Sequence, residues 1–122
     1  MNYTKCVVEM RIEIRKGGEA VIISFHTRVD NFDSDYERIT FFRKLHGWNQ
    51  TVPKNGKKYV YRRMGLLEEI PHEKIADSVF IMARKHMKMM EKFFKGWETK
   101  VDYEIMEVML KNDRKYINDQ EE

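Results

Sequence analysis

The sequence predicts an α+β fold in which a mixed sheet is backed by two helices. Several stretches alternate apolar and polar residues, as half-buried strands do, whereas two others have the spacing of an amphipathic helix. The chain has 122 residues, is 42% hydrophobic and 35% charged, and contains only two prolines, which suits one globular domain. We expect this domain to span residues 1–111 and a polar tail to follow over residues 112–122.

The N-terminal stretch Lys5–Arg15 alternates strictly and predicts a half-buried strand. Its apolar positions are Cys6, Val8, Met10, Ile12 and Ile14. The glycines of "KGGE" (16–19) favour a turn, and a second strand follows with Val21, Ile23 and Phe25 on one face. We therefore expect an antiparallel hairpin at the start of the chain.

Residues 30–47, "DNFDSDYERITFFRKLHG", change to the spacing of a helix. Asp33 or Ser34 can cap this helix, and Gly47 can end it. Its predicted buried stripe is Tyr36, Ile39, Phe42 and Leu45. From residue 48 the chain predicts a second hairpin, because Asn-Gly at 55–56 is a strong signal for a two-residue turn.

The segment "GLLEEIPHEKIAD" (65–77) is ambiguous and is compatible with a turn of helix that Pro71 ends. The next six residues, "SVFIMA", are apolar without alternation, which is typical of a strand buried on both faces. Residues 84–96 predict the second helix, and Lys100–Lys111 predict the last strand. The predicted core is Val8, Met10, Ile12, Ile23, Phe25, Phe42, Ile81, Met90, Phe94 and Ile105.

The predicted order of elements is β-β-α-β-β-β-α-β. The closing β-α-β should join two parallel strands, whereas the hairpins are antiparallel, so we expect the sheet to be mixed. From Ala20 onwards, with the strand at Lys58 taken as the second strand, the elements follow the β-α-β-β-α-β order of the ferredoxin-like fold. The sequence would then add an extra strand at the N-terminus.

Charge is distributed unevenly along the chain. The stretch from Arg38 to Leu67 contains eight basic residues and no acid, although the whole chain carries only +3. Such a local excess steers anionic partners towards it. Aromatic residues lie among the basic ones, and this combination is common in proteins that bind single-stranded nucleic acids or RNA loops.

These patterns predict a protein that binds RNA, single-stranded DNA or another polyanion. The predicted contact residues are Arg43, Lys44, Trp48, Lys54, Lys57, Lys58, Tyr59, Tyr61, Arg62 and Arg63. Alternation puts Tyr59 and Tyr61 on one face of their strand and Lys58 and Arg62 on the other, so only one of these pairs is expected to face solvent. A solvated strand edge and an acidic protein partner are the alternative explanations of the same charges.

Two other functions are compatible with the sequence. A small metal-independent nuclease or phosphodiesterase would use His46 or His72 as a general acid or base, although His46 also suits the carboxyl end of a helix. A homodimer would pair an exposed edge strand, Lys5–Arg15 or Lys100–Lys111, with its copy. The four histidines and one cysteine lack the spacing of a metal site, so we expect neither a metal nor a cofactor.

The sequences "FFRKLHGW" (Phe41–Trp48) and "YVYRRMGLLEEIPHEKIADSVFIM" (Tyr59–Met82) resemble short uncharacterised archaeal proteins. The resemblance implies an archaeal, cytoplasmic source and implies no activity. High Lys and Glu content is also a feature of heat-adapted, thermophile proteins. The start of the chain is unlike a signal peptide, no stretch has the roughly 18 apolar residues of a membrane span, and Cys6 suits a reducing compartment, so we expect a cytoplasmic protein.

Overall fold

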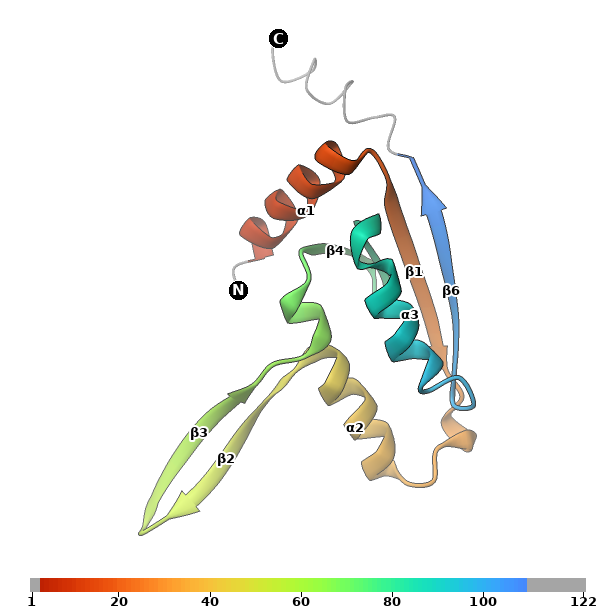
Figure 1. The fold of residues 1–122 in the computed structure, drawn as a ribbon. Helices are drawn as coiled ribbons and strands as arrows, with labels where there is room; N and C mark the ends of the chain where they lie inside the picture. The colour runs from red at the N-terminus through yellow and green to blue at the C-terminus, as the bar shows by residue number, and fades with distance from the viewer. Residues whose placement is uncertain (1–2, 110–122) are drawn as a thin grey trace. The chain divides into compact units, whose positions relative to one another are not determined.

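A computed structural model describes residues 3–109 of the chain. These residues form three α-helices and six strands, joined by three short 3-10 helices, and the predicted α+β class is confirmed (Figure 1). The chain divides into two compact units: the sheet unit, Met1–Arg28 with Pro71–Glu122, and the hairpin unit, Val29–Ile70. The predicted tail, 112–122, lies outside the described residues, and the single domain over 1–111 stays a prediction.

The first segment is a helix, α1 (Tyr3–Gly17), so the strand and the hairpin predicted there are wrong. An alternating pattern also places apolar residues at every fourth position, which is the spacing of one helix face. The residues of this face that are buried are Cys6, Met10 and Ile14. The other two apolar residues of the alternating pattern, Val8 and Ile12, stay 49% and 46% exposed. The predicted turn ends this helix instead, because Gly18 has a φ of 80° and donates its N–H to the Ile14 carbonyl at 2.6 Å.

The sheet unit contains a four-stranded sheet with the order β4-β5-β1-β6. The strands are β1 (Ala20–Thr27), β4 (His72–Ala76), β5 (Val79–Ala83) and β6 (Val101–Val108). Every pairing in this sheet is antiparallel, so the predicted mixed sheet is wrong. The connection from β5 through helix α3 (Met87–Lys95) to β6 does join strands of the same direction, but β1 lies between them and pairs with both.

The strand order of this sheet fits the ferredoxin-like type. Its second strand is β4 rather than the strand at Lys58, which belongs to a separate two-stranded sheet. The chain order also begins with a helix, so the predicted extra strand at the N-terminus does not exist. Strand β4 was missed because its residues, "HEKIA", mix charged and apolar types without a clear alternation.

The sheet is covered by α1 on one face and by α3 (Met87–Lys95) on the other. Met10 and Ile14 of α1 pack with Ala20, Ile81 and Ala83. The alternate face of β1 presents Phe25, whose ring centroid lies 5.4 Å from that of Phe94 in α3. Both faces of the sheet are covered at β5, and its buried residues are Phe80, Ile81, Met82 and Ala83. The prediction that "SVFIMA" contains a strand buried on both faces is therefore confirmed.

The hairpin unit begins with α2 (Asp35–His46), which is confirmed with its cap. The Ser34 hydroxyl accepts the Glu37 N–H at 3.1 Å, and Gly47 ends the helix with a φ of 83°. The predicted buried stripe is only partly correct. Of the predicted stripe, Leu45 is buried, Phe42 is half-buried, and Tyr36 and Ile39 are exposed; the second buried residue of α2 is Phe41, which the prediction left out.

Strands β2 (Trp48–Lys54) and β3 (Lys57–Arg63) form the predicted hairpin. Asn55 and Gly56 both have positive φ, at 53° and 75°, as a tight two-residue turn requires. A 3-10 helix, η2 (Leu66–Glu69), follows β3 and is the predicted turn of helix before Pro71. No described helix has the length and apolar character needed to cross a membrane.

Candidate nucleic-acid interface

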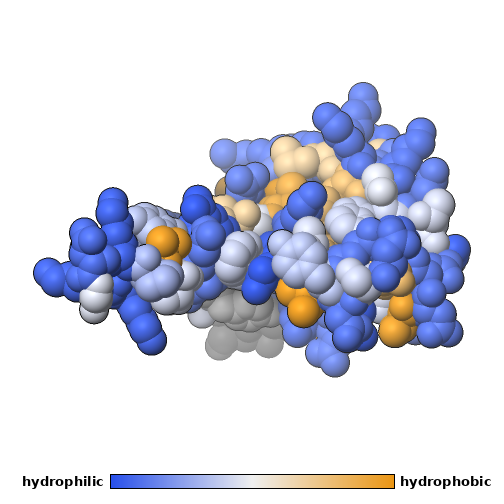
Figure 2. All heavy atoms as spheres, turned by 90° about the horizontal axis from the view of Figure 1, so that it is seen from below, coloured by the Kyte–Doolittle hydropathy of each residue, from blue (hydrophilic) through white to orange (hydrophobic). Residues whose placement is uncertain are grey.

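Both faces of the β2–β3 hairpin are open to solvent. Every residue of β3 is exposed, including Tyr59 at 42%, Val60 at 62% and Tyr61 at 48%. The expectation that one face of this strand would be buried is therefore wrong. The hairpin lies at the left of Figure 2, where hydrophilic side chains predominate.

The strand register gathers the aromatic residues on one face. Residues directly opposite each other in an antiparallel pair share a face, and Trp48 is opposite Arg63, Gln50 opposite Tyr61, and Val52 opposite Tyr59. We call this the aromatic face; it comprises Trp48, Gln50, Val52, Lys54, Lys57, Tyr59, Tyr61 and Arg63. The other face carries Asn49, Thr51, Pro53, Lys58, Val60 and Arg62.

Two guanidinium groups lie against rings of the aromatic face. The Arg43 guanidinium carbon, from α2, lies 3.9 Å from the centroid of the Trp48 ring, and that of Arg63 lies 5.7 Å from the Tyr61 centroid. Arg63 also donates from Nε to the Gln50 side-chain oxygen at 2.7 Å. Cations and rings are thus held side by side, so that the cations can neutralise phosphates while the rings stack on bases.

Three lysines surround the tip of the hairpin. Lys54 is directly opposite Lys57 in the register, and Lys58 is the next residue. Like charges directly opposite each other destabilise a strand pair. No carboxylate among the described residues forms an ion pair with any of the three, so their mutual repulsion is relieved by solvent alone.

Arg62 has a different environment from the other predicted contact residues. It forms an ion pair with Glu68 of η2, and it donates to the Asn49 side chain and to the His46 carbonyl, both at 3.3 Å. Burial raises the pKa of Glu68, but hydrogen bonds from Arg62 and from the Gly65 N–H lower it by more. The pKa of Glu68 therefore lies below its ordinary value. Arg62 therefore holds the base of the hairpin.

The base of the hairpin also depends on a close backbone approach. Gly65 is buried, and a Cβ atom at this position would collide with the backbone of His46 and Gly47 and lie 2.7 Å from the Leu45 carbonyl oxygen. Only a residue without a side chain fits between the end of α2 and the start of η2. This close approach fixes the base of the hairpin against the end of α2.

A recess of about 340 Å³ lies on the surface of α2. It is lined by Arg38, Ile39, Phe42, Arg43, His46 and Gly47. The rings of Phe42 and His46 are nearly parallel, at an interplanar angle of 3° with centroids 6.2 Å apart. Through Arg43 this recess adjoins the aromatic face.

The remaining predicted residues lie elsewhere. Lys44 is exposed on α2, and Lys58 is on the opposite face of the hairpin. His72 belongs to the sheet unit, where its ring packs against Phe80 with centroids 5.7 Å apart and its backbone N–H donates to the Cys6 sulfur at 3.2 Å. Among the described residues no group of three or more His, Cys, Asp or Glu side chains could hold a metal ion.

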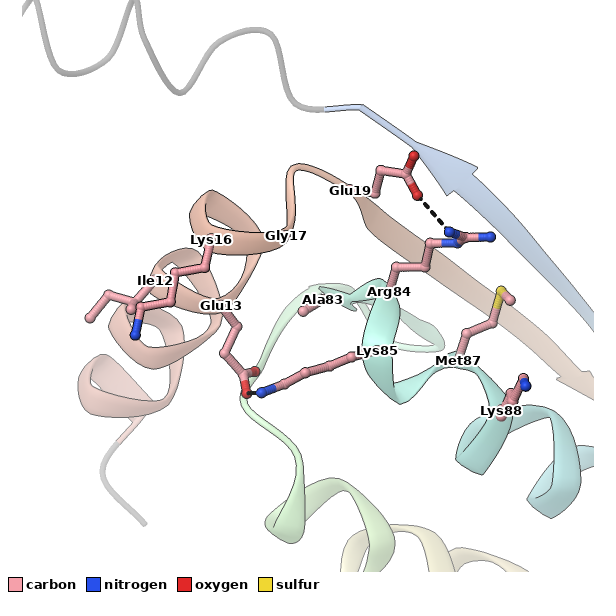
Figure 3. A pocket seen from close by; sticks show the side chains of 10 residues that line it. All are labelled: Ile12, Glu13, Lys16, Gly17, Glu19, Ala83, Arg84, Lys85, Met87 and Lys88. Atoms are coloured by element: carbon pink, nitrogen blue, oxygen red, sulfur yellow. Dashed lines mark ion pairs between the residues drawn. The ribbon is translucent and has the colours of Figure 1, made fainter.

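The sheet unit has a cleft of its own, of about 960 Å³ (Figure 3). Both carboxylates that line it are paired, Glu13 with Lys85 at 2.6 Å and Glu19 with Arg84 at 2.9 Å. Burial raises the pKa of Glu13, but Lys85 and His86 lower it by more. The pKa of Glu13 therefore lies below its ordinary value. Both carboxylates of this cleft are therefore neutralised by neighbouring cations, whereas no described carboxylate pairs with the lysines of the hairpin tip.

Comparison of the chain with family models, curated proteins and solved structures finds no match. The site therefore stands on its geometry. Sequence reasoning missed Gln50, although counting back from the two-residue turn would have placed it opposite Tyr61. It also left Arg38 out of the contact residues, although a helical spacing of four places Arg38, Phe42 and His46 on one side of α2.

Proposed function

We propose that this protein binds single-stranded nucleic acid, RNA or DNA, through the aromatic face of its hairpin. The observation that carries the proposal is the convergence of three rings and four cations on one surface of the hairpin unit: Trp48, Tyr59, Tyr61, Arg43, Arg63, Lys54 and Lys57. Exposed rings stack on unpaired bases of any sequence, and the cations neutralise the phosphates between them. Binding is expected to favour single strands and to show little base preference.

The test is a titration of a fluorescein-labelled oligouridine of about 12 nucleotides, followed by anisotropy at several salt concentrations. Affinity should fall as salt rises, because each neutralised phosphate releases a counterion. A duplex of the same length should bind more weakly, since its bases are not free to stack. Absence of binding at low salt, or tighter binding to the duplex, would rule out the proposed mode.

The double variant Lys54→Gln/Lys57→Gln removes two cations of the aromatic face. It should make the slope of log affinity against log salt shallower by about 1.4, which is two phosphates at about 0.7 each for a single strand. The matched control is Lys92→Gln/Lys95→Gln, which removes two exposed lysines with the same spacing from α3. An equal change of slope in the control would mean that net charge, and not the hairpin, governs binding.

A nuclease or phosphodiesterase is the second candidate. It is supported by the recess on α2, where His46 lies with two arginines, Arg38 and Arg43. A histidine beside guanidinium groups can move a proton at a phosphodiester that they hold. Cleavage of the labelled strand, abolished by His46→Ala while binding persists, would replace simple binding with this activity.

A further inference from the structure

We propose that β3 of one copy of this chain adds to the sheet edge at β6 of a second copy, giving a two-fold dimer. This inference does not depend on the proposed function, because it rests on the backbone edges of the strands and not on the rings of the aromatic face. A two-stranded hairpin is marginally stable in water, and a third strand stabilises it.

Four strand edges are present in the described sheets, and two of them are blocked. Pro53 removes a backbone donor from β2, which blunts that edge of the hairpin. At β4, the Cys6 sulfur contacts both the N–H and the carbonyl of His72, each at 3.2 Å, and the pairing with β5 is interrupted between Lys74 and Ala76. The edges of β3 and β6 remain.

These two edges have opposite charges. Strand β3, "KKYVYRR", contains four basic residues and no acid, whereas β6, "VDYEIMEV", contains three acids and no base. Pairing β6 with its own copy, as the predicted dimer through Lys100–Lys111 requires, would bring acids towards acids. The other predicted dimer strand, Lys5–Arg15, is a helix. Pairing β6 with β3 brings acids towards bases.

Hydrogen-bond alternation restricts the register of such a pair. The residues that flank the two-residue turn, Lys54 and Lys57, bond to each other, so the outward groups of β3 belong to the alternate residues, including Val60. Next to β6, the Arg28 N–H donates to the Lys100 carbonyl at 2.8 Å, so residues 28 and 100 form a bonded pair. By alternation, the backbone groups of even-numbered residues in β6 point towards β1. Those of odd-numbered residues, including Ile105, point outward.

One register satisfies this rule and overlaps all of β3 with β6. It places Val60 opposite Ile105, Lys58 opposite Glu107, and Arg63 opposite Asp102. The pairing joins two apolar residues and two pairs of opposite charges, and it opposes no like charges. A two-fold axis repeats the contact, so each copy donates a hairpin and accepts one.

The first test measures the mass of the full chain by light scattering across a range of concentrations. A dimer is expected, and Val60→Pro should raise its dissociation constant about 100-fold, because proline removes an outward donor without touching a bond of the hairpin. The matched control is Thr51→Pro, since Thr51 is opposite Val60 and its N–H points from the other edge. A strictly monomeric wild type, or equal effects of both variants, would overturn the proposal.

The second test does not depend on the folding of a proline variant. Two preparations, Val60→Cys and Ile105→Cys, are mixed and oxidised; residues opposite each other in a bonded pair lie about 5.5 Å apart, within reach of a disulfide. A covalent heterodimer is expected, and none with Thr51→Cys in place of Val60→Cys. Equal crosslinking of the two, or none in either, would contradict the register and with it the strand addition.

Discussion

The sheet unit and the hairpin of this chain use charged residues in opposite ways. In the sheet unit several cations are held by carboxylates from distant parts of the sequence, as Arg28 is by Asp102, Arg11 by Glu73, and Lys85 by Glu13. At the hairpin tip the lysines face each other without a described carboxylate partner. The ion pairs of the sheet unit are explained by the folding of the chain itself.

The second arrangement lowers the stability of the hairpin. Opposing Lys54 and Lys57 repel each other, and the exposed rings of Tyr59 and Tyr61 bury little surface within the hairpin. Because these lysines and tyrosines do not stabilise the hairpin itself, binding to another molecule explains their presence better than folding does. Each surface ion pair of the sheet unit contributes little to stability, so the two regions differ in how their charges are organised more than in energy.

The largest expected effect comes from adding one methyl group at the base of the hairpin. Gly65→Ala forces a Cβ into the backbone of His46 and Gly47, and because backbone cannot move aside as a side chain can, we expect a loss of about 3 kcal/mol in the free energy of unfolding. Urea denaturation measures this. Binding of the oligouridine should fall with it, since the hairpin loses its fixed base.

The sheet unit offers the matched control, Gly17→Ala in α1. The same methyl group meets nothing within 4 Å there, and alanine favours a helix, so stability should stay level or rise slightly. If the two variants were equally stable, the close approach at Gly65 would not hold the hairpin as described.

The hairpin was predictable because its signals are local, whereas α1 was not. Asn55-Gly56 specifies a turn by its own backbone preferences, and Ser34 caps its helix within three residues. The alternation of Lys5–Arg15 fits a strand and also one face of a helix, and only packing of Met10 against the sheet selects the helix. Local pattern was ambiguous there, and the deciding contacts are distant in sequence.

The candidate site was predicted in composition but not in arrangement. Alternation separated Tyr59 and Tyr61 from Lys58 and Arg62, yet it could not show that both faces are exposed, since burial depends on what else packs there. Nor did it indicate that Arg62 is held by Glu68, because their pairing depends on the turn at Gly65. The Cys6–His72 contact joins residues 66 positions apart and has no signal in the sequence.

A smaller effect is expected from removing a ring of the aromatic face. Tyr59→Ala and Tyr61→Ala should each weaken oligouridine binding by about 5- to 100-fold, as loss of one stacked base does, with little change in stability because both rings are exposed. Anisotropy measures the first and urea denaturation the second. The matched control is Tyr36→Ala, an exposed tyrosine on α2, which should bind as the wild type does. A wild-type affinity for both hairpin variants would leave only charge to explain binding.

The smallest expected effect is the pH dependence of the base of the hairpin. The pKa of Glu68 is lower in the folded chain than in the unfolded one, so its ion pair with Arg62 stabilises the fold above the unfolded value and this contribution is lost as pH falls through the folded value. Because Arg62 is 43% exposed, solvent screening limits the contribution to about 1 kcal/mol or less. Unfolding free energies of wild type and Glu68→Gln, measured from neutral pH down to acid, should differ at neutral pH and converge in acid. A gap that stays constant over this range would mean that the charge of Glu68 contributes nothing, and that the fit of Gly65 against α2 holds the hairpin alone.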